Sequence, residues 1–212
     1  MQTEVISFYS DIDGKTYYSD HAYRLKKQLE TLGIPYDIQE KPSLGSYQKN
    51  CLSKPAFIYK TLIDKQKPII WLDIDSDVRK SLNIFDQFEG NTDLAVACST
   101  PKLHAAKASP IYLAFNSKVL EFLQHWNFMA RQMMSNGQWF DHEALIGILH
   151  SFYQKDGFRM KFVGPDYCVW PGNENQNSVI VMGLADADSK KEALKKLGMS
   201  EDLIKWQTPG TK

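Results

Sequence analysis

Short apolar runs alternate with stretches of helical periodicity along most of the chain, and this alternation is the sequence feature that most constrains the fold. Strands are expected at Val5–Tyr9, Ile34–Ile38, Ile69–Leu72, Asp93–Ala97, Ile111–Phe115, Arg159–Val163 and Val179–Met182. Strands that alternate with helices form a largely parallel sheet with helices on both faces. We therefore predict the α/β class: one Rossmann-like domain, residues 1–212, with a mixed, mostly parallel central sheet flanked by helices.

The helices between these strands are bounded by capping residues. Their expected starts are Ser19, Ser53, Ser117 and Asp141. A last helix is expected to begin at a capping box formed by Ser189 and Glu192 and to end at Gly198. The aromatic residues Phe122 and Trp126 lie at helical spacing and are interpreted as core.

Composition excludes some classes of protein. Hydrophobic residues make up 43% and charged residues 24% of the 212 positions, which is typical of a globular domain and not of a disordered chain. Twenty-five Lys and Arg balance 25 Asp and Glu. A net charge of zero argues against a nucleic-acid partner bound by bulk phosphate neutralisation and against a polybasic membrane anchor.

The ends of the chain and its cysteines bear on location. The start, Met1–Glu4, has no basic region before the apolar Val5–Tyr9, and no apolar run approaches the ~18–20 residues of a membrane span, so we expect neither a signal peptide nor a span. Three widely spaced cysteines favour a reducing compartment. We expect a cytoplasmic protein. The tail Thr208–Lys212 reads as a linker, so further domains can follow it.

A pair of carboxylates follows the most apolar strand. Asp73 and Asp75 come directly after Ile69–Leu72, and strand alternation places them on the same side of an extended backbone. Mg²⁺ typically takes one or two protein carboxylates together with substrate phosphate oxygens, so this pair suits Mg²⁺ or Mn²⁺ bound with a phosphorylated substrate. The alternative is a solvated turn at a strand end, where Asp is common.

A second polar cluster, Ser10–Lys15, follows the first strand. Because ligands of α/β sheets bind beyond the carboxyl ends of the strands, this loop and the Asp73–Asp77 segment are the two places expected to hold a ligand. Tyr17 and Tyr18 follow closely and would hold a flat base by stacking. The alternative is a glycine-containing turn without a ligand.

The segment Ile69-Ile-Trp-Leu-Asp-Ile-Asp75 resembles the apolar strand and DxD motif of GT-A nucleotide-sugar glycosyltransferases. The resemblance implies that Asp73 and Asp75 hold Mn²⁺ or Mg²⁺ against the diphosphate of a UDP-sugar, with Asp73 shared with the ribose. Further residues implied to bind the nucleotide are Tyr9, Ser10, Asp11, Tyr17, Tyr18 and Lys54. Either Lys15 or Arg79 would add positive charge at the diphosphate.

The resemblance also implies a sugar and acceptor half, about residues 101–212, beside a nucleotide-binding half, about residues 1–100. Asn116-Ser117 resembles the Asn-Ser-Gly step near the donor sugar, although Lys118 replaces the glycine. Asn116, Asp141 and His142 are implied to bind the sugar. Asp141 and Glu143 are the candidate catalytic residues, as general base in an inverting enzyme or as sugar-positioning groups in a retaining one.

The metal site departs from the family pattern. Many members supply a late histidine as third metal ligand, and no histidine follows His150. Water, a phosphate oxygen, Asp186 or Asp188 would complete the shell. The resulting hypothesis is a metal-dependent, retaining glycosyltransferase that moves a hexose or deoxyhexose from a UDP-sugar to a glycan or glycoprotein acceptor. The resemblance extends to viral members that glycosylate capsid protein, and a viral protein of this kind is expected in the host cytoplasm.

Two other functions stay open. Phe8-Tyr-Ser-Asp-Ile-Asp-Gly14 resembles the nucleophile motif of haloacid-dehalogenase phosphatases, which would use Asp11 and Asp13. Lys15 and Thr16 depart from that motif, and it leaves the Asp73–Asp77 cluster unexplained. The second alternative is a nucleotide-sugar-binding module without catalysis.

Overall fold

Six of the strands form one sheet in the computed structural model, which describes residues 3–12, 14–137 and 141–196. They are β1 (Glu4–Tyr9), β2 (Tyr36–Glu40), β3 (Ile69–Trp71), β5 (Leu94–Cys98), β6 (Ala106–Leu113) and β7 (Met160–Val163). The order across the sheet is β2-β1-β3-β6-β5-β7. The pairs β1–β2, β1–β3 and β5–β7 are parallel, whereas β6 is antiparallel to both β3 and β5. The predicted mixed, mostly parallel sheet is confirmed.

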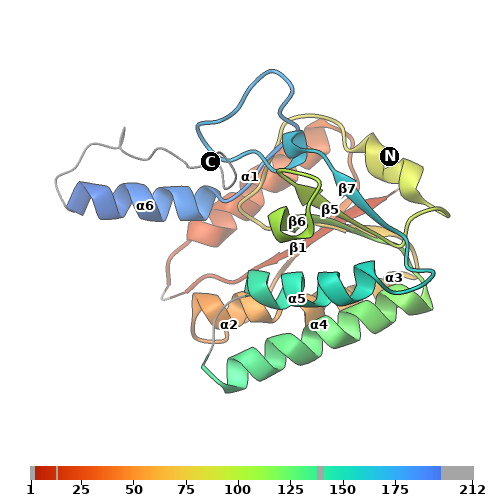
Figure 1. Cartoon of the computed structure of the whole chain (residues 1–212). Helices are drawn as coiled ribbons and strands as arrows, with labels where there is room; N and C mark the ends of the chain where they lie inside the picture. Colours follow the sequence, from red (N-terminus) through yellow and green to blue (C-terminus); the bar gives the residue numbers. More distant parts are fainter. Residues whose placement is uncertain (1–2, 13, 138–140, 197–212) are drawn as a thin grey trace.

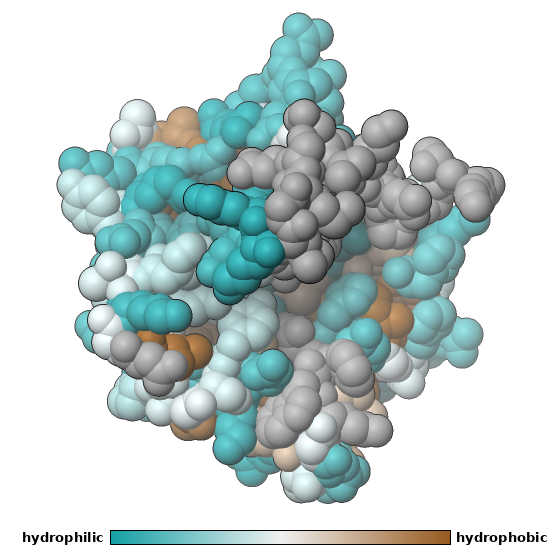
Figure 2. All heavy atoms as spheres, turned by 90° about the vertical axis from the view of Figure 1, so that its left-hand side faces the viewer, coloured by the Kyte–Doolittle hydropathy of each residue, from teal (hydrophilic) through white to brown (hydrophobic). Residues whose placement is uncertain are grey.

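Helices cover both faces of the sheet (Figure 1). They are α1 (Tyr17–Thr31), α2 (Tyr47–Leu52), α3 (Lys54–Lys65), α4 (Ser117–Ser135), α5 (Asp141–Tyr153) and α6 (Leu184–Lys196), with the 3₁₀ turns η1 (Asn83–Phe88), η2 (Leu103–Ala105) and η3 (Pro165–Tyr167). Figure 1 shows α2 to α5 together on one face and α1 on the other, while α6 projects from the side. The face on that side is mostly hydrophilic (Figure 2). Within the described ranges, no helix combines the length and apolar character that crossing a membrane requires.

A short second sheet forms beside the main one. In it, β4 (Asp77–Val78) pairs antiparallel with β8 (Ile180–Val181). The strand predicted at Val179–Met182 therefore exists, but it pairs outside the main sheet. This pairing brings the segment that precedes α6 next to the segment that follows β3.

The start of α1 differs from the predicted cap at Ser19. The helix begins at Tyr17, with Thr16 as N-cap residue, and the Ser19 hydroxyl donates to the Thr16 carbonyl at 2.9 Å. Asp11 supplies the acceptor for the first turn, because its Oδ1 accepts from the backbone amides of Tyr18 at 2.9 Å and Ser19 at 3.1 Å. The Asp11 carboxylate, from the preceding loop, therefore caps the helix in place of the predicted Ser19.

Two other helix starts were also misplaced. The cap of α4 is Asn116, whose side-chain oxygen accepts from the Val119 amide at 3.0 Å, and not Ser117. The last helix begins at Leu184, so the predicted capping box at Ser189 lies inside it; its predicted end, Gly198, lies outside the described residues. The predicted starts of α3 after Ser53 and of α5 at Asp141 are confirmed.

The core lies on both faces of the sheet. Phe122 and Trp126 of α4 are fully buried, as predicted. The Phe122 ring contacts those of Trp126, Phe152 and Phe158. Tyr112 of β6 is also fully buried.

A buried carboxylate links β5, β7 and the start of α4. Asp93 is 1% exposed, and its oxygens accept from the Arg159 amide at 2.8 Å, the Arg159 guanidinium at 2.8 Å and the Asn116 amide at 2.9 Å. Burial alone would raise the pKa of Asp93, but the hydrogen bonds and charge of Arg159 and the bond from Asn116 hold it below its usual range.

Replacing Asp93 is expected to destabilise the fold. Asp93→Ala should lower the free energy of unfolding by about 3 kcal/mol at pH 7, because it leaves several donors without their charged acceptor. Because the folded pKa is depressed, this stabilisation is present above the unfolded value, about 3.9, and is lost as the pH falls below it. Urea unfolding from pH 3 to 7 should show the gap to wild type narrowing at the acid end. The exposed Asp64→Ala is the control; an equal effect of both variants would contradict the assignment.

Candidate active site

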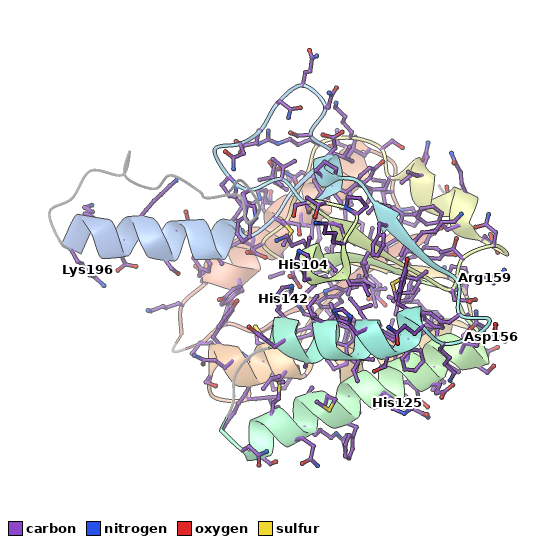
Figure 3. The ribbon with its side chains drawn as sticks, viewed as in Figure 1. His104, His125, His142, Asp156, Arg159 and Lys196 are labelled. Atoms are coloured by element: carbon purple, nitrogen blue, oxygen red, sulfur yellow. The ribbon has the colours of Figure 1, made fainter. Side chains whose placement is uncertain are left out.

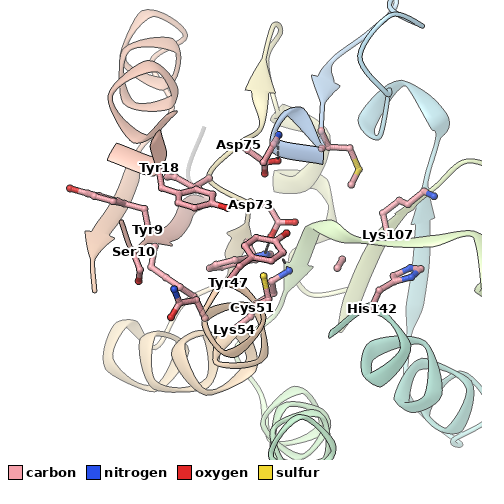
Figure 4. A pocket seen from close by; sticks show the side chains of 18 of the residues that line it. Tyr9, Ser10, Tyr18, Tyr47, Cys51, Lys54, Asp73, Asp75, Lys107 and His142 are labelled. Carbon is pink, nitrogen blue, oxygen red and sulfur yellow. Dashed lines mark hydrogen bonds and ion pairs between the residues drawn. The ribbon is translucent and has the colours of Figure 1, made fainter. Parts of the chain in front are cut away.

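The segments after β1 and β3 line one cavity of about 320 Å³ (Figure 4). Because β1 and β3 are parallel neighbours, their carboxyl ends meet at the same edge of the sheet. The first strand contributes Tyr9 and Ser10, and the segment after β3 contributes Asp73 and Asp75. Two segments predicted separately as ligand-binding thus share one site.

Asp73 is held by a buried lysine. The Lys54 ammonium lies 2.9 Å from Asp73 Oδ1, and the Lys54 side chain is only 5% exposed. The indole of Trp71 donates to the same oxygen at 3.0 Å, and the Asp73 amide donates to the Ser109 hydroxyl at 2.9 Å. These contacts orient the carboxylate toward the cavity wall that carries Lys54 and Trp71.

Asp75 is held by a helix. Its Oδ2 accepts from the backbone amide of Ala185, in the first turn of α6, at 3.0 Å. A carboxylate at a helix N-terminus is stabilised by the unpaired amides and the helix dipole. Asp75 therefore connects the cavity to α6, which explains why this helix starts at Leu184 without the predicted capping box.

The donor set fits a divalent cation that is bound jointly with phosphate. In the described part of the chain, no group of three or more His, Cys, Asp or Glu side chains is arranged to hold a metal by itself. Figure 3 shows His104, His125 and His142 on separate elements. Two carboxylates at one cavity match the pattern of Mg²⁺, which keeps other positions for phosphate oxygens and water.

Asp186 and Asp188 are the two aspartates expected as a third metal ligand, and the structure describes the side chain of Asp188. Asp188 accepts from the Tyr17 hydroxyl at 2.8 Å and lines a second cavity, of about 480 Å³, between the loop after β1 and α6. The side chain of Asp186 lies outside the described residues. Partial burial and this bond to Asp188 raise the pKa of Tyr17, so its hydroxyl stays protonated and continues to donate.

Tyrosines form the end of the cavity near β1. Tyr18 lines it together with Tyr47, and the two rings are nearly parallel, at 11°, with centroids 6.3 Å apart. Tyr17 instead lies edge-on to Tyr18 and lines the second cavity. Sequence reasoning missed Tyr47 because the short helix α2 that carries it was not predicted.

Other residues of the first loop do not line the main cavity. Asp11 and Lys15 line the second cavity, where Asp11 is bound to the amides that start α1. Asp13 lies outside the described residues. Arg79, the other cation expected near a diphosphate, pairs with Asp77 at 2.8 Å and Glu174 at 3.4 Å and is not among the residues that line either cavity.

The residues predicted to bind the sugar do not all lie at the main cavity. His142 lines the main cavity and its Nε2 donates to the Ala106 carbonyl at 2.7 Å. Asp141 begins α5 directly beside it, but its side chain lies outside the described residues. Glu143 is exposed and does not line the cavity. Asn116 lies at the opposite edge of the sheet, because the antiparallel β6 delivers its carboxyl end beside the start of β3.

Two cavity residues carried no recognisable signal in the sequence. Lys107 lies on β6, before the strand predicted at Ile111–Phe115, and Trp170 lies in the connection between η3 and β8. A Cβ on Gly183 would lie 2.4 Å from the Trp170 ring, and Gly183 has φ +77°. Only glycine fits there, because the indole covers the backbone just before α6.

The fold is shared with a solved structure among those compared. No family model and no curated protein matches the sequence. Among solved structures, the chain is similar to a glycosyltransferase involved in the glycosylation of the major capsid of PBCV-1, with a TM-score of 0.64 over 90% of this chain and 99% of that one. The two are 13% identical in sequence, so this similarity concerns the fold.

Gly183→Ala is expected to disturb the cavity wall. The substitution adds a Cβ against Trp170 and forces alanine to a positive φ, which should cost about 1–3 kcal/mol of stability. Tryptophan fluorescence should also shift as the indole moves. Gly147→Ala is the matched control: it adds a Cβ in open space on α5 and should be neutral or slightly stabilising. Wild-type melting and fluorescence in Gly183→Ala would show that the wall is loosely packed.

Proposed function

We propose that this protein is a glycosyltransferase that uses a UDP-sugar and a divalent cation, Mn²⁺ or Mg²⁺. One observation carries the proposal: a single cavity in a glycosyltransferase fold gathers Asp73, Asp75, the buried Lys54 and the ring of Tyr18. Carboxylates suit a cation, and an aromatic ring suits a base. The Tyr18 ring would contact the base of a nucleotide-sugar, and the two aspartates would hold the cation at its diphosphate.

The nucleotide half of the donor is assigned to the first part of the chain. Tyr18 and Tyr47 would hold the base, Tyr9 and Ser10 the ribose, and Asp73 and Asp75 the cation. When bound, the cation supplies Lewis-acid stabilisation of the leaving diphosphate. The ion pair with Lys54 orients Asp73 for that role.

The transferred sugar and the acceptor are assigned to the second part. His142 at the cavity, with Asp141 beside it at the start of α5, are the proposed sugar-binding groups, and Asp141 is the first candidate for a catalytic role. We propose a hexose or deoxyhexose donor, retention of configuration and a glycan or glycoprotein acceptor. The similar structure is named for the glycosylation of a viral capsid protein, which supports a process of that kind here.

The alternative phosphatase function has less support. Its nucleophile would be Asp11, whose Oδ1 accepts two backbone amides at the start of α1. Asp11 also lines the second cavity, whereas Asp73 and Asp75 line the main one. A binding module without catalysis shares the cavity with the enzyme and is distinguished from it by turnover of a UDP-sugar.

Titration calorimetry with UDP tests the proposed function. Wild type should bind UDP about tenfold or more tightly with Mn²⁺ than with EDTA, because two carboxylates and the diphosphate share the ion. Asp75→Asn should lose most of that gain while staying folded, since its amide oxygen still accepts from Ala185. The exposed Asp64→Asn is the control. UDP binding that ignores Mn²⁺ would contradict metal dependence, and no UDP binding would contradict the glycosyltransferase assignment.

Substitution of the tyrosines tests the position of the base. Tyr18→Ala should weaken UDP binding about 2- to 10-fold, because a stacked ring contributes about 0.5–1.5 kcal/mol. Tyr23→Ala, on the exposed side of the same helix, should bind as wild type does. Equal affinities of Tyr18→Ala and wild type would place the base elsewhere.

A further inference from the structure

Lys107 is a buried lysine in the cavity wall that no sequence pattern singled out. It lies near the start of β6, next to the end of β5, and is 9% exposed. Because β6 runs against its neighbours, its first residues reach the same edge of the sheet as Asp73 and Asp75. A cation is therefore built into the site on a rigid strand.

The ammonium of Lys107 is held by an aromatic ring and not by a carboxylate. It lies 5.7 Å from the centroid of the Trp170 ring, close enough for a cation–π interaction. No carboxylate among the described residues pairs with it, in contrast to Lys54, which is paired with Asp73. Burying a cation without a charged partner is costly, so the ammonium is suited to oxygen atoms of a ligand.

The position of Lys107 in the cavity indicates which part of a ligand it meets. Figure 4 shows Tyr9, Ser10 and Tyr18 at one end, Asp73 and Asp75 between, and Lys107 beside His142 at the other end. A nucleotide-sugar is linear: base, ribose, diphosphate, sugar. With the base at the tyrosines and the diphosphate at the aspartates, the group that reaches Lys107 is the sugar.

We propose that Lys107 binds the transferred sugar through hydrogen bonds from its ammonium to sugar oxygens, and so selects the donor. This inference rests on the proposed function. An ammonium offers three donors and no acceptor, so it recognises hydroxyl or ring oxygens and rejects a position that lacks one. The Trp170 ring holds the ammonium by the cation–π contact, and Gly183 leaves room for the indole.

The test compares UDP with a UDP-sugar on the same variants. UDP-glucose, UDP-galactose and UDP-N-acetylglucosamine are titrated with Mn²⁺ and without acceptor, and the one that wild type binds most tightly is used as the probe. Lys107→Met should bind UDP within about twofold of wild type and the probe about tenfold more weakly. Lys107→Arg, which keeps the cation, should recover part of the loss. Lys102→Met, exposed at the start of η2, is the matched control.

Each outcome decides the inference. Equal weakening of UDP and of the probe would place Lys107 at the diphosphate or in a structural role and would overturn it, as would unchanged binding of both. If Lys107→Met does not fold, Lys107→Arg decides. Weaker binding of the probe with unchanged binding of UDP supports the inference. Wild-type binding of the probe, or equal weakening of the probe and UDP, overturns it. Wild-type protein that binds neither UDP nor any of the three UDP-sugars would overturn the proposed function itself.

Discussion

The pairing of β3 with parallel β1 on one side and antiparallel β6 on the other determines where each group of the candidate site lies. The parallel pair brings Ser10 and Asp73 to the same edge of the sheet. The antiparallel pair brings the beginning of β6, with Lys107, to that edge and sends its end, with Asn116, to the other. Because β6 is antiparallel to β3, Lys107 lies at the site and Asn116 lies at the opposite edge of the sheet.

The two aspartates of the site are oriented by different contacts. Asp73 is paired with Lys54, which is itself buried, so neither group gains by moving away from the other. Asp75 faces the amide-rich start of α6. The carboxylates are thus oriented before any ligand arrives, which is what electrostatic preorganisation requires.

Much of the local structure was predictable, because it depends on short-range patterns. The strands around Val5 and Ile69, the start of α5 at Asp141 and the burial of Trp126 follow from apolar spacing and capping chemistry. The errors arose where a distant group replaced a local one. Asp11 serves the start of α1 in place of Ser19, and Asp75 serves the start of α6 across more than a hundred residues of chain. No local window contains such a partner.

By itself, the sequence determined that this chain forms an α/β domain and that an aspartate pair follows a buried strand, because periodicity and apolar content act over a few residues. Only the tertiary structure decided which other residues lie in the same cavity as that pair. Tyr47 enters the cavity from a helix too short to be recognised, and Lys107 enters because β6 is antiparallel, while Asn116 is carried away for the same reason. Strand direction and helix placement depend on long-range pairing and packing, which no spacing of residues along the chain encodes.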